Sequence, residues 1–388
     1  MTTRVEVSSQ VLSWARERSR RDDDYLTKRF PKLREWESGE ALPTLNQLEE
    51  FAKATYTPIG YFFLQEPPVD RLPIPDFRTV RNASVSTPSP NLLDTVAVCR
   101  QRQDWYRSYL EDDGAAPVPF VGSLRPMGDI VTTASAIRVA LSVEDQLFAD
   151  VPSWSAARGS LADRCERAGV LVMINGIVDS NTHRKLDPDE FRGFALADEL
   201  APIIFVNGAD AMAAQIFTLA HELVHIGINQ SAVSNPSLGR RQQNEIEIWC
   251  NKVAGEFLVP MGSFRLEFNR KASLESELTR LARKHKVSTL VILRRVFDAE
   301  ILTWEQYREA FDKQVALATR RTASGDGDFN VTQPIRTSKR FARAIIASTL
   351  EGRTRYTEAF RLLGFHKTSI LRGQAVQQRS CSGRAAGG

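Results

Sequence analysis

The sequence predicts an α+β fold that is mostly helical. Residues 217–226 form an apolar stretch that contains His221, Glu222 and His225 in a His-Glu-x-x-His pattern. Three short apolar runs before this stretch, rich in β-branched residues, predict the strands of a small sheet. Patterns typical of amphipathic helices fill most of the remaining chain. We therefore expect a small sheet packed beside a helix that carries polar side chains, with helical units at both ends.

Composition indicates a globular protein of two or three domains. The chain has 388 residues, of which 42% are hydrophobic and 25% charged, so it can bury a sizeable core. It contains no apolar stretch of 18 or more residues and no pattern of a secretory signal. Its four cysteines lack the Cys-x-x-Cys spacing and predict free thiols in a reducing compartment. A cytoplasmic protein is therefore expected.

The distribution of charge is more informative than its total. A formal net charge of +4 does not by itself indicate a nucleic-acid partner. Between residues 335 and 372, however, nine Lys or Arg residues stand against two Glu residues. A solvated basic helical face is the simpler interpretation of this segment, and a phosphate-binding surface is the alternative.

The N-terminal residues predict a series of short helices. One is expected over residues 8–20 after a Ser cap, and a second over residues 22–30, where Pro31 ends it. A third amphipathic helix is expected over residues 46–55. Short helices joined by tight turns are typical of helix-turn-helix units.

Several short motifs in this region resemble the end of an XRE (phage-repressor-like) helix-turn-helix domain. They are Trp36-Glu37-Ser38-Gly39, Pro43-Thr44, the Leu-Glu-Glu-Phe-Ala-Lys-Ala run and Pro58-x-x-Tyr61-Phe62. The stretch expected to hold the recognition helix, residues 27–33, is compressed and contains Pro31, whereas groove reading requires exposed polar residues at the start of that helix. We therefore expect residues 1–66 to be a degenerate domain used for structure or protein docking, with DNA binding as the alternative.

The middle of the chain predicts a linker, two helices and three strands. Residues 67–90 are rich in Pro, Ser and Thr and predict a linker. Helices are expected over residues 91–111 and 153–168, and strands over residues 169–174, 191–198 and 201–207. The edge of the resulting sheet is expected to bind an extended peptide as an added strand.

The His-Glu-x-x-His pattern predicts a metal site if its residues are helical. His221 and His225 are four residues apart and then project from one face, so both imidazoles can bind the same ion. Glu222 lies about 100° around the helix from His221, where it can reach a metal-bound water without binding the metal. A catalytic zinc ion takes three protein ligands and keeps one position open. A third ligand is therefore needed.

The segment after residue 244 offers two carboxylates for this role. On a helix, Glu247 shares its face with Cys250 and Ala254, whereas Glu245 shares its face with Lys252. Glu247 is therefore predicted to be the third zinc ligand. A His on an apolar face is more often a core residue than a ligand, but burying two His and two Glu without an ion would be costly.

The chain after Pro260 is expected to be helical. Residues 274–284 and 290–296 predict helices of a second helix-turn-helix-like unit. Residues 323–328 form a Gly-rich break, and the last fifteen residues have the composition of a disordered tail. The expected divisions are residues 1–66, 67–90, 91–262, 263–322, 323–373 and 374–388.

The combined motifs resemble the ImmA/IrrE family of metallo-endopeptidases. The most specific are His221-Glu222-x-x-His225, Glu247-x-x-x-Asn251 and Ala254-x-x-Phe257-Leu258-x-Pro260, with looser support from Ile74-Pro-Asp-Phe-Arg78 and Ser338-Lys-Arg-Phe341. The resemblance implies a zincin-like core in which His221, His225 and Glu247 bind zinc and Glu222 is the catalytic base. It also implies a bacterial or phage protein that cleaves a helix-turn-helix repressor and so switches on genes of stress response or mobile-element transfer.

Two hypotheses of function follow. The first is zinc-assisted peptide hydrolysis, in which Glu222 activates the water and a further donor, with His183 as a candidate, stabilises the oxyanion. The second is a DNA-binding transcriptional regulator, or a toxin–antitoxin component, with a structural or sensory zinc site. Such a site would be closed by a fourth protein ligand, for which Cys250 is the local candidate.

Overall fold

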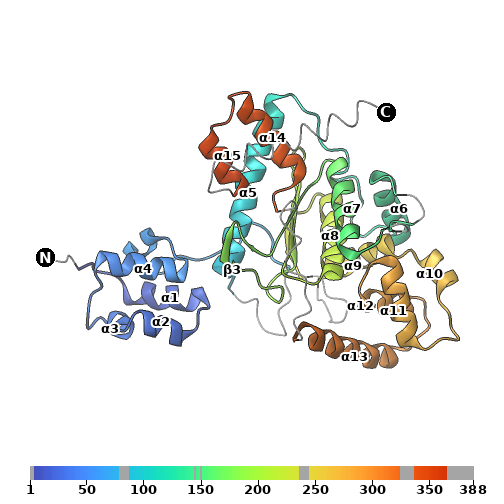
Figure 1. The fold of residues 1–388 in the computed structure, drawn as a ribbon, viewed down its shortest axis with the longest axis horizontal. Helices are drawn as coiled ribbons and strands as arrows, with labels where there is room; N and C mark the ends of the chain where they lie inside the picture. Colours follow the sequence, from blue (N-terminus) through green and yellow to red (C-terminus); the bar gives the residue numbers. More distant parts are fainter. Residues whose placement is uncertain are drawn as a thin grey trace. The chain divides into compact units, whose positions relative to one another are not determined.

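A computed structural model of the chain describes residues 4–77, 87–143, 146–148, 151–235, 244–323 and 336–364. The chain divides into two compact units. One comprises residues 1–73 and 80–96, and the other comprises residues 74–79 and 97–388. Among the described residues, no helix is both long and apolar enough to cross a membrane. Figure 1 shows the helices and strands in chain order.

The first unit is a group of short helices around an aromatic core. They are α1 (Ser9–Ser19), α2 (Asp23–Arg29), α3 (Leu33–Ser38), α4 (Leu45–Thr55) and the 3-10 helix η1 (Ile59–Phe63). The ring of Phe51 packs edge-on against Phe30 at 5.3 Å between centroids and lies 5.7 Å from Phe62. Thr44 and Gln47 form a reciprocal capping box at the start of α4. The three helices predicted for this region are confirmed.

The stretch expected to hold the recognition helix, residues 27–33, is interrupted in the structure. The helix α2 ends at Arg29 and α3 begins at Leu33, on the other side of Pro31. Pro31 lacks the backbone N–H that would continue α2, so the chain turns there. Gly39, with φ of 78°, then ends α3 in the left-handed conformation that favours glycine.

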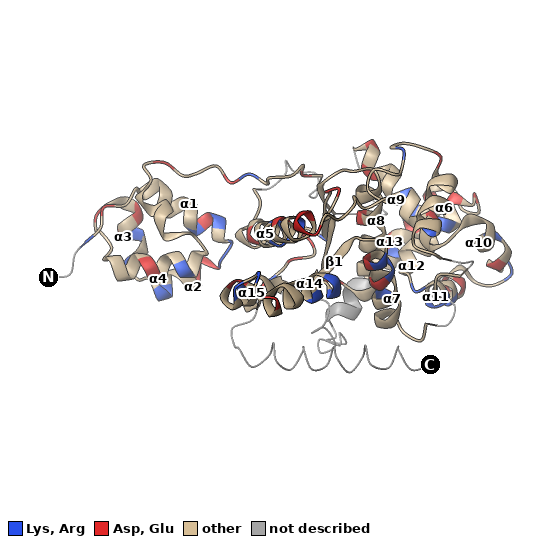
Figure 2. Cartoon of the chain, turned by 90° about the horizontal axis from the view of Figure 1, so that it is seen from above, with Lys and Arg blue, Asp and Glu red and all other residues tan. Residues whose placement is uncertain are grey.

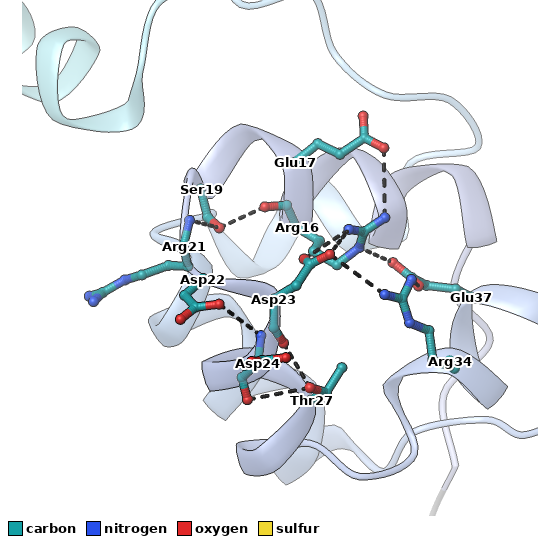
Figure 3. A network of polar contacts seen from close by, with 10 residues as sticks. All are labelled: Arg16, Glu17, Ser19, Arg21, Asp22, Asp23, Asp24, Thr27, Arg34 and Glu37. Atoms are coloured by element: carbon teal, nitrogen blue, oxygen red, sulfur yellow. Dashed lines mark hydrogen bonds and ion pairs between the residues drawn. The ribbon is translucent and has the colours of Figure 1, made fainter.

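Charged side chains of the first unit pair with one another across α1, α2 and α3 (Figure 3). The Arg16 guanidinium donates to Glu37 at 2.7 Å and to Asp23 at 2.9 Å. Arg34 on α3 lies 3.3 Å from Glu37 and 3.6 Å from Asp23. Figure 2 shows that residues of both signs alternate on these helices. The charges of Arg16 and Arg34 are therefore balanced by carboxylates of the same unit.

The second unit contains a four-stranded sheet in the order β1-β5-β4-β6. Its strands are β1 (Leu171–Asn175), β4 (Gly193–Leu196), β5 (Ile203–Asn207) and β6 (Ala232–Ser234). β1 and β5 are parallel, and β4 is antiparallel to both β5 and β6. A separate hairpin consists of β2 (Ile177–Val178) and β3 (Asn181–Lys185). The sequence predicted β1, β4 and β5 but not β6 or the hairpin.

Helices pack on this sheet in successive layers. The helix α7 (Trp154–Arg167) contacts β1 and α8 (Met212–Gly227), while α9 (Glu245–Leu258) packs on α8, and α6 (Ile130–Ala140) packs on α9. In Figure 1, α8 lies beside the sheet with α7 and α9 next to it, and α8 contacts both β4 and β5. Every residue of α8 from Gln215 to Gly227 is buried. α8 is therefore a central helix of the core, as its unbroken apolar pattern predicts.

Four further helices continue the core beyond α9. They are α10 (Met261–Glu267), α11 (Leu274–His285), α12 (Thr289–Asp298) and α13 (Trp304–Ala323). Arg295 on α12 forms a buried ion pair with Glu256 on α9. This pair fixes α12 to the helix that carries Glu247. The helices expected over residues 274–284 and 290–296 are confirmed.

A cluster of Glu267, Lys284 and His285 predicts a loss of stability in acid. Burial alone would raise the pKa of Glu267, but hydrogen bonds from Lys284 and His285, at 2.9 and 2.8 Å, outweigh it and lower that pKa. Burial also lowers the pKa of His285. Both pKa values are lower in the folded than in the unfolded protein, so the unfolded state binds more protons as the pH falls below about 6.5.

We therefore expect the free energy of unfolding to decrease from pH 7 to pH 5, and to decrease less in His285→Gln. Urea unfolding at both pH values, with a chelator present so that metal binding does not contribute, measures the difference. An unchanged pH slope in His285→Gln would contradict the assignment.

The basic C-terminal segment packs against the second unit. Its helices α14 (Lys339–Leu350) and α15 (Tyr356–Leu363) lie beside α5 (Pro90–Asp112), whose residues from Ala97 onward belong to this unit (Figures 1 and 2). The Arg102 guanidinium on α5 donates to the Leu362 carbonyl at 2.9 Å. Lys339 pairs with Asp163 at 2.8 Å, and Arg353 pairs with Asp113 at 2.9 Å. Part of the basic charge therefore serves packing. Residues 365–388, including the expected disordered tail, lie outside the described residues.

Candidate metal centre

The helix α8 places its two histidines side by side. His221 and His225 are separated by one helical turn, and their ring centroids lie 4.9 Å apart. Their Nε2 atoms are 3.1 Å apart. Both side chains are fully buried. The spacing predicted from the helical period therefore brings two imidazole nitrogens to the same point.

The helix α9 brings a carboxylate to this point. Glu247 Oε1 lies 2.9 Å from His225 Nε2, and Glu247 Oε2 lies 3.3 Å from His221 Nε2. Asn244 caps the helix by accepting a hydrogen bond from the Ile246 N–H, which fixes where α9 begins. Glu247 is 1% exposed, whereas Glu245 points to solvent. The helical-face argument from the sequence therefore identified Glu247 as the buried one of these two carboxylates.

These three side chains fit a metal ion. One candidate ligand atom from each of His221, His225 and Glu247 lies within 4.8 Å of the others. Within the described part of the chain, this is the group of His, Cys, Asp and Glu residues that meets such a criterion. Two imidazole nitrogens and one carboxylate oxygen are a ligand set that Zn²⁺ takes in catalytic sites. Apart from the two imidazoles, no described residue hydrogen-bonds to the Glu247 carboxylate.

The local electrostatics favour the ligand forms of these groups. Burial would raise the pKa of Glu247, but the charges and hydrogen bonds of His221 and His225 outweigh it and lower the pKa to about 2. Burial lowers the pKa of His225, with a further contribution from neighbouring His221. Metal binding requires a deprotonated carboxylate and a neutral imidazole. The site therefore holds Glu247 and His225 in the protonation states that bind a metal near neutral pH.

Glu222 lies next to this group but is not part of it. Its side chain is fully buried, and neither carboxylate oxygen has a hydrogen-bond partner among the described residues. Burial, followed by repulsion from Glu247, raises the pKa of Glu222 well above its usual value, while the Ser234 hydroxyl opposes this rise. A carboxyl group with a raised pKa beside a metal site can both accept and return a proton.

Two residues of the sheet lie near Glu222 and were not identified from the sequence. Gly193 on β4 and Ser234 on β6 are cross-strand partners. A Cβ atom at Gly193 would lie 3.2 Å from Glu222 Oε1, 2.6 Å from Thr218 Cγ2 and 2.8 Å from the Phe205 carbonyl oxygen. The signal in the sequence was a glycine inside a predicted strand, which indicates close approach of another group.

Replacing Gly193 with Ala is expected to destabilise the protein by about 1–3 kcal/mol, because the new methyl group overpacks the interface of β4 and α8. Gly255→Ala is the matched control. Gly255 lies inside α9, and a Cβ there meets no atom within 4 Å, so this change should be neutral or stabilising by up to about 1 kcal/mol. Urea unfolding of both variants measures the two changes in the free energy of unfolding. Equal stability of the two would contradict the close approach of β4 to α8.

Two other candidates from the sequence are placed differently. His183 lies exposed on β3 of the separate hairpin, and none of its described contacts involves Glu222 or the three candidate ligands. The proposal that it stabilises an oxyanion therefore has no support in the structure. Cys250 is buried near Glu247, but burial and the neighbouring carboxylates raise the pKa of its thiol well above its usual value. Cys250 also lies outside the group of His221, His225 and Glu247.

Fold and site together define a small mixed sheet beside a helix, with a buried site of two histidines and a glutamate that can hold a metal. Two segments of the chain match known families. Residues 165–297 match the Peptidase_M78 family, an IrrE N-terminal-like domain, and residues 337–373 match a domain of unknown function. No curated protein matches the chain. The first match covers β1 to β6, α8 and α9, and it supports a peptidase of the ImmA/IrrE kind.

Proposed function

We propose that the protein is a zinc-dependent endopeptidase whose site consists of His221, His225, Glu247 and Glu222. The observation that carries this proposal is the convergence of both Nε2 atoms and the Glu247 carboxylate within 4.8 Å. The match of residues 165–297 to a peptidase family supports the same reaction class. The neighbouring Glu222, whose carboxylate makes no hydrogen bond to a described residue, supplies the proton-transfer group that hydrolysis requires.

The chain's own residues would act as ligands and as a base. His221, His225 and Glu247 would hold the ion, which, when bound, acidifies a water and polarises the substrate carbonyl. Glu222 accepts the proton of the attacking water and delivers it to the leaving amine. Burial raises the pKa of Glu222, which makes its ionised form a stronger proton acceptor. The surrounding apolar core excludes bulk water.

The proposed substrate is a helix-turn-helix repressor. This part of the proposal rests on the resemblance to the ImmA/IrrE family, and the first unit would serve to dock a protein. The internal pairing of Arg16 and Arg34 with carboxylates favours this use over DNA binding.

Incubation with a candidate repressor tests the activity. A helix-turn-helix repressor chosen as the candidate substrate should be cut at one or a few sites in the presence of zinc, as seen by gel electrophoresis and mass spectrometry. A chelator should stop the reaction, and renewed zinc should restore it. Absence of cleavage by zinc-loaded protein, together with a salt-dependent gel shift on operator DNA, would favour the regulator alternative.

A further inference from the structure

The site is closed, although a peptidase must admit a peptide chain. His221, Glu222 and His225 are 0% exposed, and Glu247 is 1% exposed. A substrate carbonyl cannot reach a metal held by these residues unless a covering element moves. The elements on which the site is built, α8 and α9, are central to the core. The element that moves is therefore to be sought at the edge of the sheet.

The outer edge of β6 is occupied by the chain itself. Residues 74–77, here named the strap, run parallel to β6, with Asp76 opposite Val233. The Val233 N–H donates to the Pro75 carbonyl at 2.9 Å, and the Phe77 N–H donates to the Val233 carbonyl at 3.0 Å. The other edge of β6 pairs with β4. The sequence predicted a sheet edge free to bind a peptide, but the strap already uses this edge.

The strap also reaches the metal site. The ring of Phe77 lies 6.3 Å from the ring of His225, between centroids, at an interplanar angle of 37°. Ser234, the neighbour of Val233 on β6, is the cross-strand partner of Gly193, where a Cβ atom would lie 3.2 Å from Glu222 Oε1. The strap therefore combines edge-strand hydrogen bonds with an apolar side chain beside a candidate metal ligand, which are the two contacts that an extended peptide substrate would make.

The strap lies at the edge of the sheet. Its backbone pairs with β6 at a single bridge, and Pro75 has no N–H to extend the ladder. Phe77 is only partly buried. By contrast, β4 pairs with β5 over four residues in the centre of the sheet. Local opening of an edge segment with such short backbone pairing needs much less free energy than unfolding of the sheet.

We infer that the strap is a displaceable edge strand that blocks the peptidase cleft. An extended peptide takes its place on β6, and an apolar side chain of that peptide occupies the position of Phe77 beside His225. This inference rests on the proposed function and adds a regulation to it. The fraction of molecules with the strap displaced then sets the apparent affinity for substrate.

A binding measurement with a fluorescent peptide hydroxamate tests the inference. This probe binds zinc and is not cleaved, and its Kd is measured for the zinc-loaded full chain. If the strap is closed in nine molecules of ten, Phe77→Ala should lower the apparent Kd up to about tenfold. Phe77→Leu, which keeps an apolar side chain, should stay near wild type. Val69→Ala is the control, because Val69 is 75% exposed on the same segment of chain. Zinc content and circular dichroism establish that each variant is folded and loaded.

Amide hydrogen exchange supplies a second readout. On binding the hydroxamate, the Phe77 N–H should exchange faster, because its acceptor on Val233 passes to the peptide. Equal Kd values for wild type and Phe77→Ala, or unchanged exchange at Phe77, would overturn the strap's role and leave the proposed peptidase standing. If no zinc-loaded variant binds the hydroxamate, the proposed peptidase site is itself overturned, and the strap's role with it.

Discussion

Glu222→Gln is expected to abolish peptide hydrolysis while zinc remains bound. Gln has nearly the volume of Glu but cannot accept a proton from water, so the variant loses the general base. Such groups contribute about 10²–10⁴-fold to rate. Glu222 is not one of the three candidate ligands, so the metal content should equal that of the wild type. Burial, followed by repulsion from Glu247, penalises the charged form of Glu222, whereas the Gln amide is neutral, so we expect the variant to be at least as stable as wild type.

Cleavage of the repressor and zinc content are measured on the same preparation. Glu245→Gln makes the same chemical change on α9 at an exposed position and should keep both properties. Glu222→Gln with more than a tenth of wild-type activity would contradict the role of this residue as the base. Loss of zinc in Glu222→Gln would instead indicate that Glu222 is a metal ligand.

The arrangement of the candidate metal site could be predicted because it depends on local geometry. The α-helical period alone places His221 and His225 on one face and separates Glu247 from Glu245. The buried position of Glu247 and the exposed position of Glu245 follow from that period. The prediction needed only that the two apolar segments were helical. How α8 and α9 meet was inferred from chemistry, since a buried carboxylate needs a partner.

Elements that depend on distant partners were not predictable in the same way. β6 has three residues inside a turn-rich stretch and becomes a strand because β4 lies on one side and the strap on the other. α6 contains several β-branched residues, which have modest helix propensity, and it is stabilised by packing against α9. The ion pair of Lys339 with Asp163 joins residues 176 positions apart. Counting charges along the sequence could not reveal it.

Glycine at position 193 shows the same limit. Within the sequence it is one small residue in a strand pattern, and only the approach of Thr218 and Glu222 explains why a side chain would not fit. The sequence was therefore enough to select Glu222 as a candidate residue, whereas the residues that surround it could be identified only in the three-dimensional structure.

Glu247→Ala is expected to lose zinc. Two imidazoles alone leave the ion with one protein ligand too few. The affinity for zinc should therefore fall by more than the roughly 10–100-fold that follows loss of an outer-shell partner. In the metal-free protein the change also removes the carboxylate that lies 2.9 Å from His225 and 3.3 Å from His221. Activity should disappear together with the metal.

Thermal unfolding with zinc and with a chelator measures this effect independently of activity. Zinc at 100 times its Kd stabilises the wild type by about 2.7 kcal/mol, so its Tm should rise when zinc is added. Glu247→Ala should melt at the same temperature under both conditions. Glu245→Ala, two residues away on the exposed face of α9, should respond to zinc as the wild type does. Full zinc occupancy in Glu247→Ala would show that another group supplies the third ligand. The convergence of α8 and α9 on one ion would then have no chemical basis.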